Sequence, residues 1–117
     1  MRLLKLFTKF TMNWGMVFLE KVYQNSLYLE LKNKGYKVEA QKKILVYYKG
    51  IEVVEYFADL LVEDLIILEL KAADCIVKDF ENQILNYLRG TDCEVGLLLN
   101  FGKKPEFRRK IFENNRK

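Results

Sequence analysis

The sequence of 117 residues contains no histidine, one proline and two cysteines. Without histidine the chain cannot build a Ser-His-Asp or Cys-His catalytic group or any histidine-ligated metal site. The two cysteines, Cys75 and Cys93, match no zinc-binding spacing, and we interpret them as reduced thiols of a cytoplasmic protein. Any catalysis must therefore depend on carboxylates, lysine, tyrosine or a metal held by oxygen atoms.

Long hydrophobic runs are also missing. No continuous apolar stretch reaches the length that crosses a bilayer, so no membrane partner is expected. The start, "MRLLKLFTKFTMNWG", is basic and amphipathic, but Lys5 and Lys9 interrupt the apolar run that a signal peptide needs. We expect residues 1–14 to be an atypical lead-in that packs against a single domain spanning residues 15–117. A helix lying on a membrane surface is the alternative for this lead-in.

What is present is enough hydrophobic material for one core. Hydrophobic residues make up 50% of the chain and aromatic residues 14%, which indicates a globular domain and excludes a disordered chain. The net charge of +4 fits an anionic partner. Many ordinary proteins are as basic, so the charge alone gives little information about function.

The hydrophobic periodicity predicts a helix, three strands, a helix and a fourth strand, which makes an α/β (α+β) fold. The first helix is expected over residues 16–34 and ends near Gly35. The strands are expected over 36–50, 51–62 and 65–72, with a hairpin at Lys49-Gly50. The second helix is expected over 77–90 and the last strand over 93–102, followed by a basic tail over 103–117.

Three charged residues interrupt the apolar strands. Glu69 and Lys71 lie two positions apart, so both side chains leave the same face of the strand, the face that Ile67 also occupies. Asp59 lies on the preceding strand and faces Glu69 only if the loop between the strands has an odd number of residues, such as 63–65. A two-residue turn would place Asp59 opposite Leu68, on the other face. An ordinary solvated face is the alternative explanation for these charges.

Each helix also places a polar group on an apolar face. Glu20 lies within about 60° of the apolar stripe of the first helix, in the middle of the face predicted to cover the core. The alternative is that Glu20 ends this stripe and reaches solvent or a lysine. On the second helix, Gln83 and Tyr87 are four residues apart and share a face.

Together these residues could converge on one site. Glu20, Asp59 and Glu69 would form a hard, oxygen-only ligand set, which suits Mg²⁺ or Mn²⁺. Lys71 could orient a water molecule or neutralise charge in a transition state, as phosphodiester hydrolysis requires.

The motif Asp59 followed by Glu69-Leu70-Lys71 resembles that of the PD-(D/E)XK nuclease superfamily. Gln83 and Tyr87 match the Gln-x-x-x-Tyr pattern of its recombination exonucleases. More narrowly, Glu20-Lys21-Val22-Tyr23 and the blocks "FADLLVEDLIILELKA", "QILNYLRGTD" and "VGLLLNFG" are similar to the small bacterial GxxExxY family.

The resemblance implies a restriction-endonuclease-like αβββαβ core, with a mixed four-stranded sheet flanked by helices. It also implies a nuclease that acts on nucleic acid, expected to be DNA. Asp59 and Glu69 would be the principal ligands of Mg²⁺ or Mn²⁺, and Glu20 an accessory ligand or a base. Lys71 would stabilise the transition state, and Gln83 would position Lys71 or a water at the metal.

Two other functions remain open. The chain could be a nuclease-fold module that binds nucleic acid without cleaving it, through phosphate contacts from Lys103, Lys104, Arg108 and Arg109. It could instead be a subunit of a larger complex, and a homodimer is also left open.

Overall fold

The computed structural model describes residues 20–102 and 105–117; the predicted lead-in over 1–14 lies outside them. The elements follow the predicted order, with one strand more. They are α2 (Glu20–Asn33), β1 (Val38–Tyr48), β2 (Ile51–Val62), β3 (Ile66–Lys71), α3 (Lys78–Arg89), β4 (Val95–Phe101), β5 (Pro105–Ile111) and the short 3-10 helix η1 (Asn114–Arg116).

The strands form one five-stranded mixed sheet in the order β1-β2-β3-β4-β5. The β3–β4 pair is parallel and the other pairs are antiparallel. The predicted mixed sheet is confirmed, but four strands was wrong because the basic tail contains β5. Pro105 is the first residue of this edge strand, a position where the missing N–H does not disturb the sheet.

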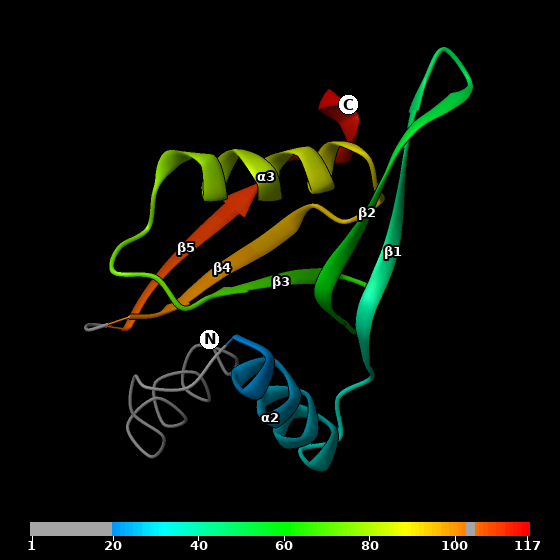
Figure 1. Ribbon diagram of the computed structural model, residues 1–117. Helices are drawn as coiled ribbons and strands as arrows, with labels where there is room; N and C mark the ends of the chain where they lie inside the picture. The colour runs from blue at the N-terminus through cyan, green and yellow to red at the C-terminus, as the bar shows by residue number, and fades with distance from the viewer. Residues whose placement is uncertain (1–19, 103–104) are drawn as a thin grey trace.

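The two helices cover opposite faces of the sheet, as Figure 1 shows. On the α2 face, Tyr23, Leu27 and Leu31 pack with buried residues that include Leu68 and Leu70. On the α3 face the buried set is Ile44, Ala58, Leu61, Ile67, Ile84, Tyr87, Leu88 and Cys93. In the described part of the chain, no helix is both long and apolar enough to cross a membrane.

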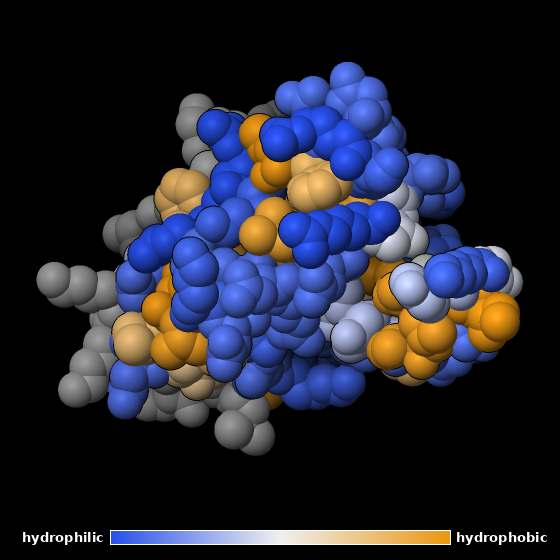
Figure 2. Space-filling model, turned by 90° about the horizontal axis from the view of Figure 1, so that it is seen from above, coloured by the Kyte–Doolittle hydropathy of each residue, from blue (hydrophilic) through white to orange (hydrophobic). Residues whose placement is uncertain are grey.

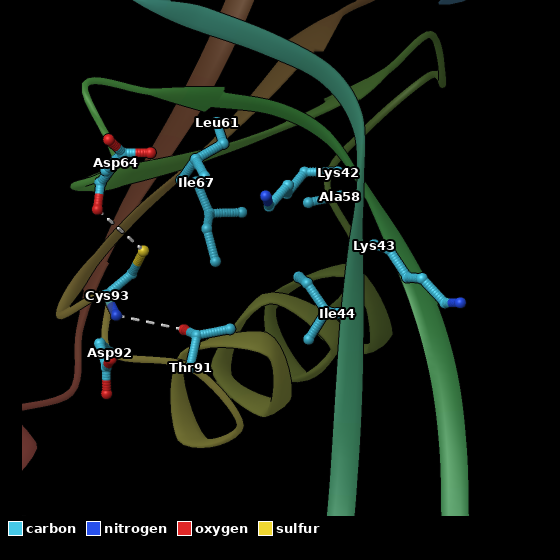
Figure 3. A pocket seen from close by; sticks show the side chains of 10 residues that line it. All are labelled: Lys42, Lys43, Ile44, Ala58, Leu61, Asp64, Ile67, Thr91, Asp92 and Cys93. Carbon is cyan, nitrogen blue, oxygen red and sulfur yellow. Dashed lines mark hydrogen bonds between the residues drawn. The ribbon is translucent and has the colours of Figure 1, made fainter.

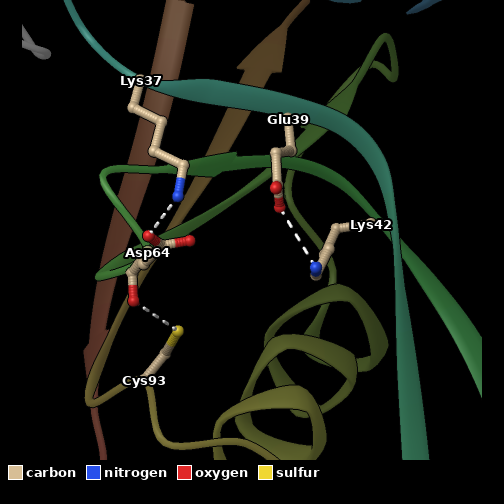
Figure 4. A network of polar contacts seen from close by, with 5 residues as sticks. All are labelled: Lys37, Glu39, Lys42, Asp64 and Cys93. Atoms are coloured by element: carbon tan, nitrogen blue, oxygen red, sulfur yellow. Dashed lines mark hydrogen bonds and ion pairs between the residues drawn. The ribbon is translucent and has the colours of Figure 1, made fainter.

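The loop between β2 and β3 has the odd length that the site requires. Its residues, 63–65, follow Val62 and precede Ile66. Glu63 and Asp64 have φ angles of 55° and 56°, the left-handed region in which the chain can reverse tightly. The resulting register pairs Leu60 with Leu68, and its continuation places Asp59 opposite Glu69. An ion pair of 2.6 Å between Lys37 and Asp64 borders this loop (Figure 4).

On the N-terminal side of Leu60 in β2, the β1–β2 pair separates from the rest of the sheet. The ladder between β2 and β3 covers only residues 60–62 of β2, whereas β1 and β2 stay paired as far as Tyr48 and Ile51. The hairpin projects from the body at the right of Figure 1. Tyr48 is 64% exposed and Ile51 is 68% exposed. Seen from above, hydrophobic side chains gather over this projection (Figure 2).

We expect Gly96→Ala to lower the free energy of unfolding by about 1–3 kcal/mol, because the core there is already full. An added Cβ at Gly96 would lie 2.8 Å from the Ile84 side chain, so this side chain would have to move. Denaturant unfolding of both proteins measures the difference. Equal stability would show that Ile84 repacks without cost.

Candidate active site

The site forms where β2 and β3 separate. The Asp59 backbone N–H donates to Glu69 Oε1 at 3.1 Å, and the Leu70 backbone N–H donates to Asp59 Oδ2 at 2.8 Å. Past the last ladder pair, carboxylate oxygens therefore accept the N–H groups that strand carbonyls would otherwise bind. Buried N–H groups need such acceptors. This arrangement explains structurally why Asp59 and Glu69 are tolerated within apolar strands.

The two carboxyl groups form a closely coupled acidic pair. Glu69 is 4% exposed. Burial raises its pKa to about 8, and the neighbouring charge of Asp59 adds to the increase. Burial also raises the pKa of Asp59, against the lowering effect of the hydrogen bond from Leu70 N–H and the charge of Lys71. Two like charges this close are unfavourable, so the pair is expected to keep one proton at neutral pH.

Lys71 lies on the same side as the acidic pair. It is the last residue of β3, and its charge lowers the pKa values of Asp59 and Glu69. Its Nζ lies 4.8 Å from the centre of the Phe80 ring on α3, a cation–π distance. Phe80 thus gives the flexible lysine a defined position next to the carboxylates.

The second helix contributes a hydrogen-bonded pair, formed by the two residues whose spacing predicted only a shared face. Gln83 Nε2 donates to the Tyr87 hydroxyl at 2.8 Å. Burial raises the pKa of Tyr87 to about 12, with a further contribution from the charge of Glu69. This contribution means that Tyr87 lies near the acidic pair. The Tyr56 ring of β2 is 5.1 Å from that of Tyr87 and tilted against it.

Glu20 does not join the acidic pair. It is exposed in the first turn of α2. No group of three or more His, Cys, Asp or Glu side chains placed to hold a metal occurs among residues 20–102 and 105–117. The predicted three-carboxylate cluster is thus absent there. The physical reason is position: the apolar face of α2 meets the sheet only from Tyr23 onward, so Glu20 ends the stripe at its solvent side.

Gln24, one turn further along α2, is the residue that this helix directs toward the site. It is 5% exposed, and its Oε1 accepts a 2.8 Å hydrogen bond from Gln41 Nε2. The same Nε2 lies 3.5 Å from Asp59 Oδ1, a long contact. Gln41 has a left-handed φ of 52°, and the neighbouring ladder pairs place it opposite Asp59. A buried Gln on an apolar stripe was the sequence signal for this residue.

The donor set fits a hard divalent cation. Asp59 and Glu69 offer only oxygen atoms, and burial raises the pKa values of both carboxyls despite the lowering effect of the Lys71 charge. Mg²⁺ is commonly held by one or two carboxylates and keeps several waters, so a third acidic ligand is not needed.

Asn100 is a polar residue of the region that the motif analysis did not single out. It is 0% exposed within the apolar strand β4. Its Oδ1 accepts from the Ala73 N–H, and its Nδ2 donates to the Ala73 carbonyl, both at 3.0 Å. The signal in the sequence was the single amide in an otherwise apolar strand.

A cavity of about 240 Å³ lies between the β1–β2 hairpin and the end of α3 (Figure 3). Ile44, Leu61 and Ile67 give it apolar walls, and the Cys93 thiol also lines it. Cys93 Sγ donates to the Asp64 carbonyl at 3.8 Å (Figure 4). Burial raises the pKa of this thiol, which makes it a poor nucleophile.

The lysines at the rim of this cavity are paired within the chain. Lys42 Nζ lies 3.2 Å from Glu39 Oε2, and Lys43 Nζ lies 3.1 Å from Glu55 Oε2. The rim therefore offers no excess of positive charge to an anionic ligand.

The predicted phosphate-binding residues divide into two groups. Lys103 and Lys104 lie outside the described residues. Arg108 and Arg109 are exposed on the edge strand β5, and Arg108 makes a long ion pair of 3.7 Å with Glu106.

The fold and this site define an α+β protein with a restriction-endonuclease-like core, in which an Asp and a Glu-x-Lys motif meet at diverging strands. A family model described as the PD-(D/E)XK nuclease superfamily matches residues 2–110. The chain belongs to this superfamily.

The comparison with solved structures gives the same fold. The crystal structure of SSO0001 matches with a TM-score of 0.67 and 16% sequence identity, over 93% of this chain. The chain spans 58% of the length of that protein. At this identity the likeness concerns the fold alone. The comparison with curated proteins gave no match.

Proposed function

We propose that this chain is a metal-dependent nuclease of the GxxExxY family that hydrolyses phosphodiester bonds, with DNA as the expected substrate. The single observation that carries the proposal is the pair of hydrogen bonds across the separating strands, from Asp59 N–H to Glu69 Oε1 and from Leu70 N–H to Asp59 Oδ2, with Lys71 on the same side. Membership of the nuclease superfamily supports it. The Glu20-x-x-Tyr23 motif supports the narrower family.

In this proposal Asp59 and Glu69 hold Mg²⁺ or Mn²⁺. When bound, the cation would neutralise the acidic pair and polarise a phosphoryl oxygen. The Lys71 ammonium stabilises negative charge that develops on the phosphate, and Phe80 keeps the ammonium in place. Gln83, held by Tyr87, orients a water molecule or Lys71. Glu20, exposed at the start of α2, is assigned no part of this set.

The test is a cleavage assay of the intact chain on single-stranded DNA, double-stranded DNA and RNA, with Mg²⁺, with Mn²⁺ and with a chelator. We expect cleavage that requires the cation and is lost in Asp59→Asn. A chain that cleaves none of these substrates with either ion, or cleaves them equally after Asp59→Asn, contradicts the proposal.

The second candidate function is a nucleic-acid-binding module without catalysis. The exposed Arg108 and Arg109 on β5 and the net charge of +4 favour it. Such binding would weaken steeply with salt, because Lys and Arg contacts release counterions from the phosphates. It would also persist in Asp59→Asn without any cation.

Size-exclusion chromatography of the same samples tests the homodimer, for which the exposed hairpin offers a surface.

A further inference from the structure

Asn100 is the most deeply buried polar side chain near the site, and the nuclease motif gives it no role. It lies in β4 directly beside Lys71, its partner in the parallel β3–β4 register. We propose that Asn100 is a positioning residue for Lys71, which acts by fixing the loop through which β3 leaves the sheet. This inference rests on the proposed nuclease function.

The side-chain amide of Asn100 acts in place of a peptide group. It accepts the N–H of Ala73 and donates to the carbonyl of the same residue, with both distances at 3.0 Å. The backbone N–H and carbonyl of a residue on a neighbouring strand would pair with the peptide groups of Ala73 in the same way. The sheet contact on β3 is therefore extended two residues past Lys71, the last residue of the strand. No apolar side chain of this size could supply both a donor and an acceptor.

Ala73 lies where it can control both parts of the lysine site. It belongs to the segment 72–77, which connects Lys71 at the end of β3 to the first turn of α3. That turn carries Phe80, over which the Lys71 ammonium lies at 4.8 Å. Fixing the loop thus fixes the strand end and the ring that holds the ammonium. A lysine has four rotatable bonds, so a small displacement of either support would move its charge.

Gly102 shows independently that the loop is held closely. A Cβ at this position would lie 2.2 Å from the Ala73 carbonyl oxygen and 3.0 Å from Asn100 Nδ2. The first distance is impossible for a real side chain next to backbone, so Gly102→Ala must displace Ala73. This substitution disturbs the same contact and leaves Asn100 itself unsubstituted.

The experiment compares Asn100→Leu, Asn100→Asp and Gly102→Ala with Gly96→Ala as the matched control. Gly96 lies on the same strand, but its crowded neighbour is Ile84. Asn100→Leu keeps the branched shape and the number of heavy atoms and removes both hydrogen bonds. Asn100→Asp keeps the acceptor for Ala73 N–H and replaces the Nδ2 donor, so it serves if the leucine variant does not fold. Denaturant unfolding identifies the folded variants.

The first readout needs no catalytic activity. In the metal-free protein, the ε-methylene protons of Lys71 should be shifted upfield by the Phe80 ring, and Phe80→Leu identifies this signal. We expect the upfield shift to fall to less than about half in the Asn100 and Gly102 variants and to persist in Gly96→Ala. If the intact chain cleaves nothing, the proposed function fails, whereas this readout still tests the positioning role.

The second readout is steady-state cleavage. We expect kcat to fall roughly 10- to 100-fold in the Asn100 and Gly102 variants, with KM and the Mn²⁺ Kd changed less than about threefold. Retention of the Lys71 shift in all three variants overturns the proposal. Loss of the shift or of kcat to the same extent in Gly96→Ala also overturns it, because the effect would then follow stability alone.

Discussion

Lys71→Met is expected to lower kcat for metal-dependent cleavage by about 10²- to 10³-fold, the usual cost of removing one group that stabilises transition-state charge. Methionine retains an unbranched apolar stem that can still lie against Phe80, so the packing at the end of β3 is preserved. The acidic pair is intact in this variant. We therefore expect Mn²⁺ to bind with an affinity close to that of the unmodified chain.

The control for this prediction is Lys78→Met. Lys78 is exposed at the first position of α3. Its substitution removes the same charge from the chain without touching the acidic pair. We expect its kcat to stay within about twofold, since an exposed charge is screened by solvent. If Lys78→Met and Lys71→Met reduce cleavage equally, the effect of Lys71 is one of net charge, and its catalytic role is wrong.

Glu69→Gln is expected to stabilise the metal-free protein by about 2–4 kcal/mol at pH 8 while abolishing its activity. The folded-state pKa of Glu69 is about 8, against an ordinary value of 4.5. Between these values the folded state binds more protons than the unfolded state. The contribution of Glu69 to the free energy of unfolding is therefore fully present below pH 4.5 and is lost as the pH rises toward 8. Glutamine has no charge to bury, so the variant should lose this dependence.

Thermal or denaturant unfolding at pH 5 and pH 8, with a chelator present, measures the effect. Glu63→Gln is the matched control, because Glu63 is exposed in the β2–β3 loop and should change little at either pH. Adding Mn²⁺ at pH 8 should recover stability in the unmodified chain and not in Glu69→Gln. A Glu69→Gln protein that is no more stable at pH 8 than the unmodified chain would show that burial of this carboxylate carries no cost.

Much of the fold was predictable because its determinants are local. Alternation in the strands placed Glu69 and Lys71 on the face of Ile67, and the structure keeps them on the α3 side. Asp59 was predicted to face Glu69 only if the β2–β3 loop has an odd number of residues, and the loop has three. The fifth strand was missed because the charged residues of β5 read as a solvated tail.

The errors at the site have a different cause. Helical periodicity gives the direction of a side chain but not where the helix meets the sheet. Glu20 and Gln24 are four residues apart on one face of α2, yet only Gln24 is buried. Asn100 was missed for a similar reason, since its side chain bonds to Ala73, which lies 27 residues earlier in the chain. Contacts that join distant segments depend on tertiary structure, which no local pattern contains.

The most direct test of this account is a calorimetric titration of the unmodified chain and of Glu69→Gln with Mn²⁺ at pH 8. The account predicts saturable binding to the unmodified chain, with proton release from the acidic pair, and at least a tenfold weaker affinity in Glu69→Gln, roughly the 1.4 kcal/mol that one lost carboxylate ligand should remove. Absence of binding to the unmodified chain, or equal affinity in the two proteins, would contradict it.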